Sequence, residues 1–160
     1  MYIHQLKDES MGKIEEAIKQ SEFKDNFNKV VVNLLYTHSY LVTFQTTVLK
    51  PMDLSPEQYN VLRILRGQQG KPATIAAIQE RMLNNMSNAS RLVDKLKAKG
   101  LVKREECPLN RRKVDVVITA EGLSLLELLE PQITNMNKKA IHLEDQEVAL
   151  LNELLDKLRG

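Results

Sequence analysis

Apolar residues recur at the three- and four-residue spacing of a helix along most of the chain, which predicts a mainly helical protein. Within residues 1–25 this spacing predicts one short amphipathic helix. A longer helix is expected from about residue 26 to Leu49, and Pro51 ends it because a proline disfavours helical backbone at the residue before it. The apolar surface of the longer helix is wider than a single stripe, so we expect it to be buried on more than one side.

A second group of helices begins at Ser55, which caps a helix that starts with Pro56 and continues to Arg66. Thr74 caps a short helix, and the turn Asn84-Asn85 leads into the next one. Two short helices and a tight polar turn ahead of a basic helix are typical of a helix-turn-helix. The short helix and the residues after it are expected to supply apolar contacts from Ile75, Ala76, Ile78, Met82 and Leu83.

The stretch from Asn84 to Thr119 carries the most informative pattern. Its helix has an apolar stripe at i, i+3, i+4 and i+7, and Gly100 ends it in left-handed backbone. Strands are then expected at Leu101–Cys107 and Lys113–Thr119, joined by a turn over residues 108–111. A helix-turn-helix followed by such a ribbon, the wing, is a winged helix. The stripe that faces the core consists of Ala89, Leu92, Val93 and Leu96.

The outward face of this helix begins with small polar side chains and an arginine, not with the mixture of Glu and Lys usual on a solvated helix. Small residues allow close approach to DNA, hydroxyl and amide groups meet base edges, and arginine binds guanine or phosphate. An arginine at the tip of the wing is long enough to enter a minor groove. The residues expected to contact double-stranded DNA are Ser87, Asn88, Ser90, Arg91, Lys95, Arg111, Arg112 and Lys113.

The positive charge is concentrated in the same part of the chain. Between Arg81 and Lys113 ten Lys and Arg residues stand against three acidic residues, a net charge of +7, whereas the whole chain carries +2. Such a concentration is expected of a protein that binds a polyanion, although charge runs are more often only solvated faces. The cations expected to hold phosphates or to attract DNA at long range are Lys95, Lys97, Lys99, Lys103 and Arg104.

The two ends of the chain are more apolar than a small winged helix could cover. After Thr119, which caps the next helix, leucines recur on nearly all sides, and a final helix starts at Glu144. We expect both ends to pack against each other in a homodimer. The predicted fold class is therefore mainly α with a small β-ribbon (α+β). A single domain, 1–160, would hold dimerisation helices at 1–50 and 120–160 and a winged helix-turn-helix at 54–119.

Composition and chemistry narrow the functional class. The 160 residues include one cysteine, no apolar run that approaches the roughly 20 residues of a membrane span, and no signal peptide, which favours the cytoplasm and no membrane partner. His4, His38 and His142 have no ligand-spaced partners. We find no nucleophile–base pair and no phosphate loop, so we expect no enzyme, cofactor or metal site. For Cys107, a redox role stays open beside that of an ordinary strand residue.

The segments LSPEQYNVLRIL, SNASRLVDKLKAKGLVKRE and NRRKVDVVITAEG resemble the MarR (multiple antibiotic resistance regulator) family of winged-helix transcription factors. The resemblance covers about residues 28–158 and is most specific from Asn84 to Thr119. It implies a homodimer that binds a pseudo-palindromic operator, usually as a repressor. In many members of the family a small molecule or an oxidant releases the DNA.

The resemblance also implies roles for single residues. Arg112 matches the family's minor-groove arginine, and Asn110 stands where the family usually has an aspartate that helps to fix the wing. Small effectors of the family often bind where the long helix meets the wing-bearing lobe. By that comparison, the candidate effector site consists of Tyr36, His38, Tyr40 and Phe44. For His38, a position in the core or at an interface is the simpler interpretation.

One alternative stays open beside a DNA-binding regulator. A winged helix can lose DNA binding, keep its dimer and serve as a protein-interaction module. The two functions differ in their salt dependence, since DNA affinity falls steeply as salt rises.

Overall fold

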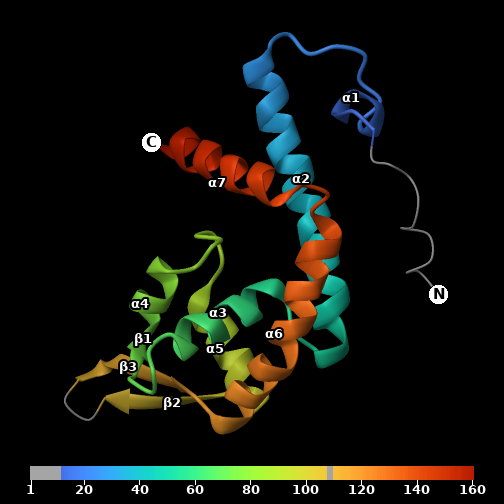
Figure 1. Cartoon of the computed structure of the whole chain (residues 1–160). Coiled ribbons are helices and arrows are strands. Elements are labelled where there is room, and N and C mark those ends of the chain that lie inside the picture. The colour runs from blue at the N-terminus through green and yellow to red at the C-terminus, as the bar shows by residue number, and fades with distance from the viewer. Residues whose placement is uncertain (1–11, 108–109) are drawn as a thin grey trace. The chain divides into compact units, whose positions relative to one another are not determined.

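The computed structural model describes residues 12–107 and 110–160, with side chains described for 12–104 and 115–160. The described part of the chain forms two compact units, which divide between Val42 and Thr43 (Figure 1). The boundary between them falls inside the helix α2 (Asn26–Leu49). No helix in the described part of the chain is both long enough and apolar enough to cross a membrane.

The first unit contains α1 (Ile14–Ala17) and most of α2. Asp25 begins α2, because its carboxylate accepts hydrogen bonds from the backbone N–H and the side-chain amide of Asn28 at 2.8 and 2.7 Å. The Asn28 backbone N–H lowers the pKa of this carboxyl group. An ion pair of 2.8 Å between Lys29 and Glu15 joins α2 to α1.

The start and end predicted for α2 are confirmed, but the burial expected on more than one side is not found within one chain. Leu49 is the single buried residue of α2, which the structure describes in full. Phe27, Val31 and Leu35 are exposed at helical spacing. An apolar helix face stays exposed where no described element packs against it, and exposed apolar surface of this kind is typical of an interaction site.

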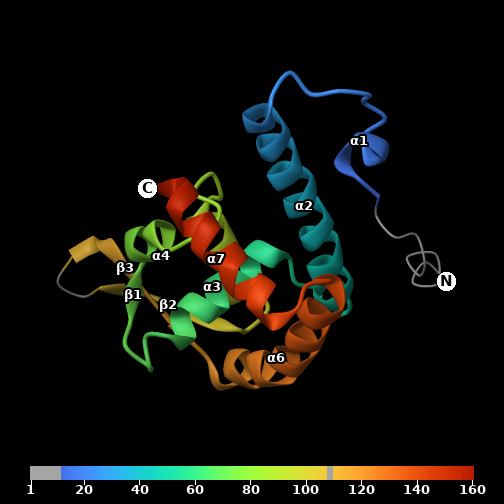
Figure 2. The same cartoon turned by 45° about the horizontal axis from the view of Figure 1, so that its top comes forward.

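The second unit is built on a winged helix. Its elements are a 3-10 turn η2 (Lys50–Met52), α3 (Pro56–Arg66), β1 (Ala73–Thr74), α4 (Ile75–Glu80), α5 (Ala89–Ala98), β2 (Val102–Cys107), β3 (Asn110–Ile118), α6 (Ala120–Ala140) and α7 (Asp145–Arg159). The strands form an antiparallel sheet in the order β1-β3-β2. The hairpin of β2 and β3 projects from one side of the unit, and α6 leads away on the other side (Figures 1 and 2).

The core of this unit lies where α3 packs against α5, α6 and β3. Completely buried side chains from four elements meet there, and their removal from water supplies the main stabilising free energy of such a core. These side chains are Val61, Leu62 and Leu65 of α3, Val93 and Leu96 of α5, Val116 of β3, and Leu126 and Leu129 of α6.

The helix ends agree with the expected caps. Ser55 and Gln58 form a reciprocal capping box at α3, and the Thr74 hydroxyl accepts a hydrogen bond of 3.2 Å from Ala77 N–H at α4. Gly100 has the left-handed φ of 73° that ends α5. The Thr119 hydroxyl accepts a hydrogen bond of 3.1 Å from Gly122 N–H at the start of α6.

Four details differ from the sequence-based prediction. The two-residue strand β1 was not expected, and it forms because Ala73 and Thr74 pair with Val116 and Asp115. Asn110 and Arg111 belong to β3 instead of the turn, because the ladder continues to the pair Cys107–Asn110. Leu92 is half-buried, whereas the other three residues of its stripe are buried. Leu83, expected to make apolar contacts, is exposed.

The last two helices leave much apolar surface uncovered. Pro131 lies within α6, which nevertheless continues to Ala140. In α7, which begins after Glu144 as predicted, none of the residues is buried. Its exposed apolar side chains are Leu150, Leu151, Leu154 and Leu158.

The start of α6 sits too close to the base of the hairpin for any side chain at Gly122. A Cβ there would fall well inside the contact distance of the Leu101 carbonyl oxygen and 2.8 Å from Ile118 Cγ1. We expect Gly122→Ala to lower the free energy of unfolding by about 1–3 kcal/mol, because backbone must move to admit the methyl group. Thermal unfolding at fixed protein concentration measures the effect.

The control for this substitution is Gly67→Ala. Gly67 has a helical φ of −63°, and the nearest atom to its added Cβ lies at 3.4 Å. An equal loss of stability in the two variants would contradict the close approach at Gly122.

Candidate nucleic-acid interface

The turn between α4 and α5 is held by hydrogen bonds from both sides. The Gln79 side chain donates to the Asn85 carbonyl oxygen at 3.1 Å and accepts from the Ala89 N–H at 3.0 Å. The Asn60 side-chain oxygen of α3 accepts from the Leu83 N–H at 2.9 Å. These contacts fix where α5 begins relative to α3 and α4.

Neither Gln79 nor Asn60 was singled out in the sequence. Both are half-buried polar residues in helices that otherwise turn apolar side chains inward. A polar residue at such a position has to find a hydrogen-bond partner, and this requirement is the signal that could have identified them.

The expected base-contacting residues lie around the first turn of α5. Asn88 is its N-cap, and its side-chain oxygen accepts from the Arg91 N–H at 3.0 Å. This oxygen therefore stabilises the helix, and the amide nitrogen is the atom left for an outside partner. Arg91 is exposed, and Ser87 and Ser90 are half-buried beside it. The structure thus brings four of the predicted residues together at one end of α5.

The cations predicted to hold phosphates fall into two groups. Lys95, Lys97 and Lys103 are exposed. Arg104, on β2, forms an ion pair with Asp94 of α5.

Lys99 belongs with Arg104 in the second group. It pairs with the Asp53 carboxylate at 2.9 Å, donates to the Asp53 carbonyl oxygen, and lies 3.5 Å from Gln58 Oε1. Both cations therefore have partners within the protein, because the fold brings acids that are distant in sequence next to them. These acidic partners compete with phosphate for the side chains of Lys99 and Arg104.

The wing is described through its backbone. Residues of β2 and β3 pair in register from Val102–Ile118 to Glu106–Val114, and an irregularity after Glu106 leads to the pair Cys107–Asn110. Arg111, Arg112 and Lys113 lie on β3, and their side chains lie outside the described part of the structure, as do those of Asn110 and Cys107. The predicted turn residues Pro108 and Leu109, and His4, also lie outside the described residues.

The four residues of the candidate effector site all belong to α2. Tyr36, Tyr40 and Phe44 follow one another at i, i+4 and i+8 and are half-buried, whereas His38 is exposed. At about 100° per residue, His38 points away from the other three. The helix therefore does not place the four side chains on one face.

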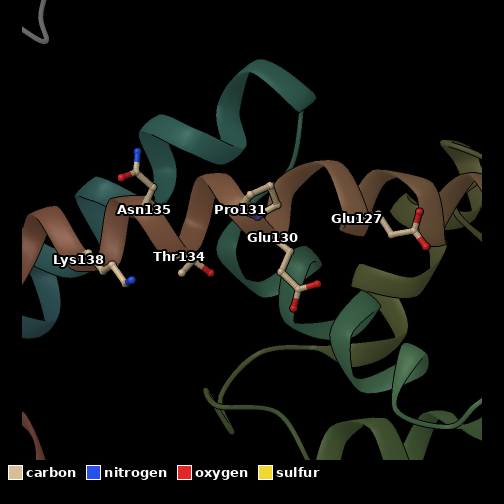
Figure 3. A pocket seen from close by; sticks show the side chains of 6 residues that line it. All are labelled: Glu127, Glu130, Pro131, Thr134, Asn135 and Lys138. Carbon is tan, nitrogen blue, oxygen red and sulfur yellow. The ribbon is translucent and has the colours of Figure 1, made fainter.

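A hollow of about 470 Å³ lies along α6 in the second unit (Figure 3). One of its lining residues, Glu130, accepts two hydrogen bonds from the Arg66 guanidinium of α3, at 3.1 and 3.3 Å. The hydrogen bond from Arg66 lowers the pKa of this carboxyl group. None of the four candidate effector residues lines the hollow, whose walls are Glu127, Glu130, Pro131, Thr134, Asn135 and Lys138.

Within the described residues, no group of three or more His, Cys, Asp or Glu is arranged to hold a metal ion.

The comparisons with known proteins agree with the fold and the sequence motifs. The sequence profile of the MarR family matches residues 52–113, which include α3, α4, α5 and most of the hairpin. No curated protein matches the chain in sequence.

Many solved structures resemble this one. A MarR transcription factor from Planctomyces limnophilus is 29% identical, with a TM-score of 0.67, over 84% of this chain and 98% of that one. A MarR variant from E. coli in complex with operator DNA is 22% identical, with a TM-score of 0.76, over 88% of this chain and 100% of that one.

A third structure concerns the regulation of DNA binding of Bordetella bronchiseptica BpsR by 6-hydroxynicotinic acid. It is 22% identical, with a TM-score of 0.75, over 82% of this chain and 99% of that one. Proteins of this family are transcription factors and not enzymes, in agreement with the expectation for this chain. The match of the family profile over residues 52–113, the shared fold and the winged helix built around α5 support a MarR-family winged-helix regulator.

Proposed function

We propose that the protein is a homodimeric, sequence-specific DNA-binding regulator that represses transcription from a pseudo-palindromic operator. The observation that carries this proposal is the first turn of α5. There the exposed Arg91 and the amide of Asn88 stand beside two serine hydroxyls, on a helix whose start is fixed by Gln79 and Asn60. Rigid placement of a few polar side chains is what direct reading of bases requires.

In this proposal α5 lies in a major groove. Arg91 donates two hydrogen bonds to a guanine edge, and Ser87, Asn88 and Ser90 meet neighbouring bases or phosphates. The exposed Lys95 and Lys97 add attraction to the DNA backbone, which carries no sequence information but strengthens binding at low salt.

The wing has a separate role. Arg112 enters the adjacent minor groove, where A·T-rich sequence narrows the groove and strengthens its negative potential. Arg111 and Lys113 contact phosphates on either side. This assignment rests on the sequence motif and on the position of these three residues on β3 near the end of the hairpin.

A homodimer supplies the second recognition helix. The uncovered leucines of α7 and the uncovered face of α2 give two apolar surfaces that a second copy would bury. In sequence, the proposed dimerisation helices at 1–50 and 120–160 come before and after the lobe 54–119. Two-fold symmetry would place the two copies of α5 about 34 Å apart, in successive major grooves.

A small-molecule effector is the proposed release signal, and the cytoplasm is the proposed compartment. The related structure of BpsR, with DNA binding regulated by 6-hydroxynicotinic acid, supports regulation of this kind. Such a ligand has to bind the DNA-free arrangement of the lobes more tightly than the DNA-bound one. Tyr36, Tyr40 and Phe44, on one stripe of α2, are the residues to test first.

The test of the proposed function is selection of bound sequences from a random duplex library at about 0.15 M salt, where surface charges are already well screened. An inverted repeat with half-site centres about one helical turn apart is the expected result. Recovery of no motif, together with weak binding to random duplex at every salt concentration, would contradict it and favour a protein-interaction module.

Arg91→Ala is expected to lose affinity for the selected operator and also the discrimination between operator and random DNA. Loss of a two-hydrogen-bond contact to guanine costs about 1–3 kcal/mol of discrimination. Fluorescence anisotropy with both duplexes measures it. Lys139→Ala, at an exposed position on α6, is the control. An equal loss on both duplexes would make Arg91 a phosphate contact only.

Arg112→Ala is expected to weaken binding by about 1–3 kcal/mol when the sequence beside the half-site is A·T-rich, and by less when it is G·C-rich. Operators that differ only in this flank separate the two cases. Unchanged affinity on both flanks would rule out a minor-groove contact by the wing.

Leu151→Glu is expected to convert the dimer into monomers, because it places a charge in the centre of the apolar stripe of α7. Analytical ultracentrifugation measures the mass in solution. Ala149→Glu, which adds the same charge to the opposite side of α7, should leave the dimer intact. A dimeric Leu151→Glu variant would show that α7 is not part of the interface.

A further inference from the structure

Two large apolar side chains are almost fully exposed at the start of the proposed recognition helix. Leu83 is 91% exposed and Met86 is 93% exposed, which makes them the most exposed large apolar residues in the described part of the chain. Single exposed apolar residues are common on protein surfaces and need no explanation. Leu83 and Met86 lie within four residues of each other in the turn that leads to α5, and we call them the turn pair.

The exposure of the turn pair does not come from a loose loop. The Leu83 N–H donates to Asn60 Oδ1 at 2.9 Å, and the Met86 N–H donates to Asn84 Oδ1 at 3.0 Å. The Gln79 side chain holds both sides of the turn through Asn85 and Ala89. The backbone is thus fixed while both side chains remain in water.

The surroundings of the turn pair are cationic. From Glu80 to Lys99, five Lys and Arg residues accompany two acids, Glu80 and Asp94, a net charge of +3 in this stretch of the sequence. Asp94 is paired with Arg104 and Lys99 with Asp53, whereas Arg91, Lys95 and Lys97 are exposed. The complementary partner is therefore a polyanion that also offers apolar groups at close range.

DNA satisfies both conditions in its major groove. The phosphates supply the negative charge, and the C5-methyl group of thymine is the apolar group that the base pairs expose there. The turn pair precedes Ser87, Asn88 and Arg91, which the proposed function places against base edges. Methionine, which is flexible and polarisable, adapts well to such a contact.

We propose that Leu83 and Met86 are specificity-determining residues that contact thymine methyl groups at one position or more in each half-site. This inference rests on the proposed function. The turn pair then selects T·A pairs at these positions through apolar contact, beside the hydrogen-bonded reading by Arg91. An acidic or apolar protein partner on the same surface is the competing interpretation, and the experiment separates the two.

The experiment replaces each thymine of the selected operator by deoxyuridine, which removes only the C5-methyl group. Symmetric pairs of positions are changed together, and affinity is measured by fluorescence anisotropy. One buried methyl group is worth about 0.8 kcal/mol, so each lost contact should weaken binding about fourfold, and the symmetric pair about sixteenfold.

The variants assign the effect to residues. Met86→Ala and Leu83→Ala should each bind the normal operator more weakly and should lose sensitivity to deoxyuridine at the thymine that the missing side chain contacts. Met52→Ala, which makes the same change as Met86→Ala on the turn η2, should keep the full sensitivity. Circular dichroism confirms that the variants are folded.

Two results would overturn the inference. One is an operator on which no deoxyuridine substitution weakens the parent protein. The other is full deoxyuridine sensitivity in both turn-pair variants, as a protein-docking surface would give. In both cases an operator has been selected and bound, so the proposed function stands. Failure to select any operator is the separate result that removes both.

Discussion

The packing of one face of α5 against α3 determines what the rest of the winged helix presents. Because Val93 and Leu96 are buried completely in the core, the rotation of α5 about its axis is set, and Arg91 and Lys95 have to face outward. Gln79 and Asn60 then fix where the helix begins. Apolar burial supplies most of the free energy, and the two polar residues supply the geometry, since hydrogen bonds are far more directional than apolar contacts.

Electrostatics in this region depends on partners as well as on charge count. The net charge between Arg81 and Lys113 includes Lys99 and Arg104, which already pair with Asp53 and Asp94. Exposed ion pairs of this kind contribute little to stability, but they orient the side chains that form them. The Asp94–Arg104 pair joins α5 to β2, so the recognition helix and the first strand of the wing are linked by a side-chain contact as well as by the short connection through Gly100.

Local patterns predicted much of this fold, because caps and periodicity act over a few residues. Ser55, Thr74 and Thr119 begin helices through their side-chain hydroxyls, and Gly100 ends one through its left-handed backbone. The features that were missed depend on residues far apart in sequence: the pairing of β1 with β3, the Lys99–Asp53 contact, and the exposure of Leu83. From sequence, an apolar residue just after a helical stripe is predicted to be buried. Its exposure becomes apparent only when the conformation of the turn is known. For the site, the sequence identified the residue types around α5 but not the polar residues that hold them.

The two hydrogen bonds of the Thr119 hydroxyl limit which residues can replace it. Its hydroxyl donates to the Gly100 carbonyl oxygen at 2.8 Å and accepts from the Gly122 N–H, so one oxygen atom connects the end of α5 to the start of α6. Valine matches threonine in shape but has neither donor nor acceptor, ionised aspartate has acceptors only, and asparagine carries its donor and its acceptor on separate atoms of a longer side chain. Serine alone keeps both functions on an equally short side chain. In a mutational scan this position should therefore tolerate a single replacement, although it lies outside every surface proposed here to touch a partner.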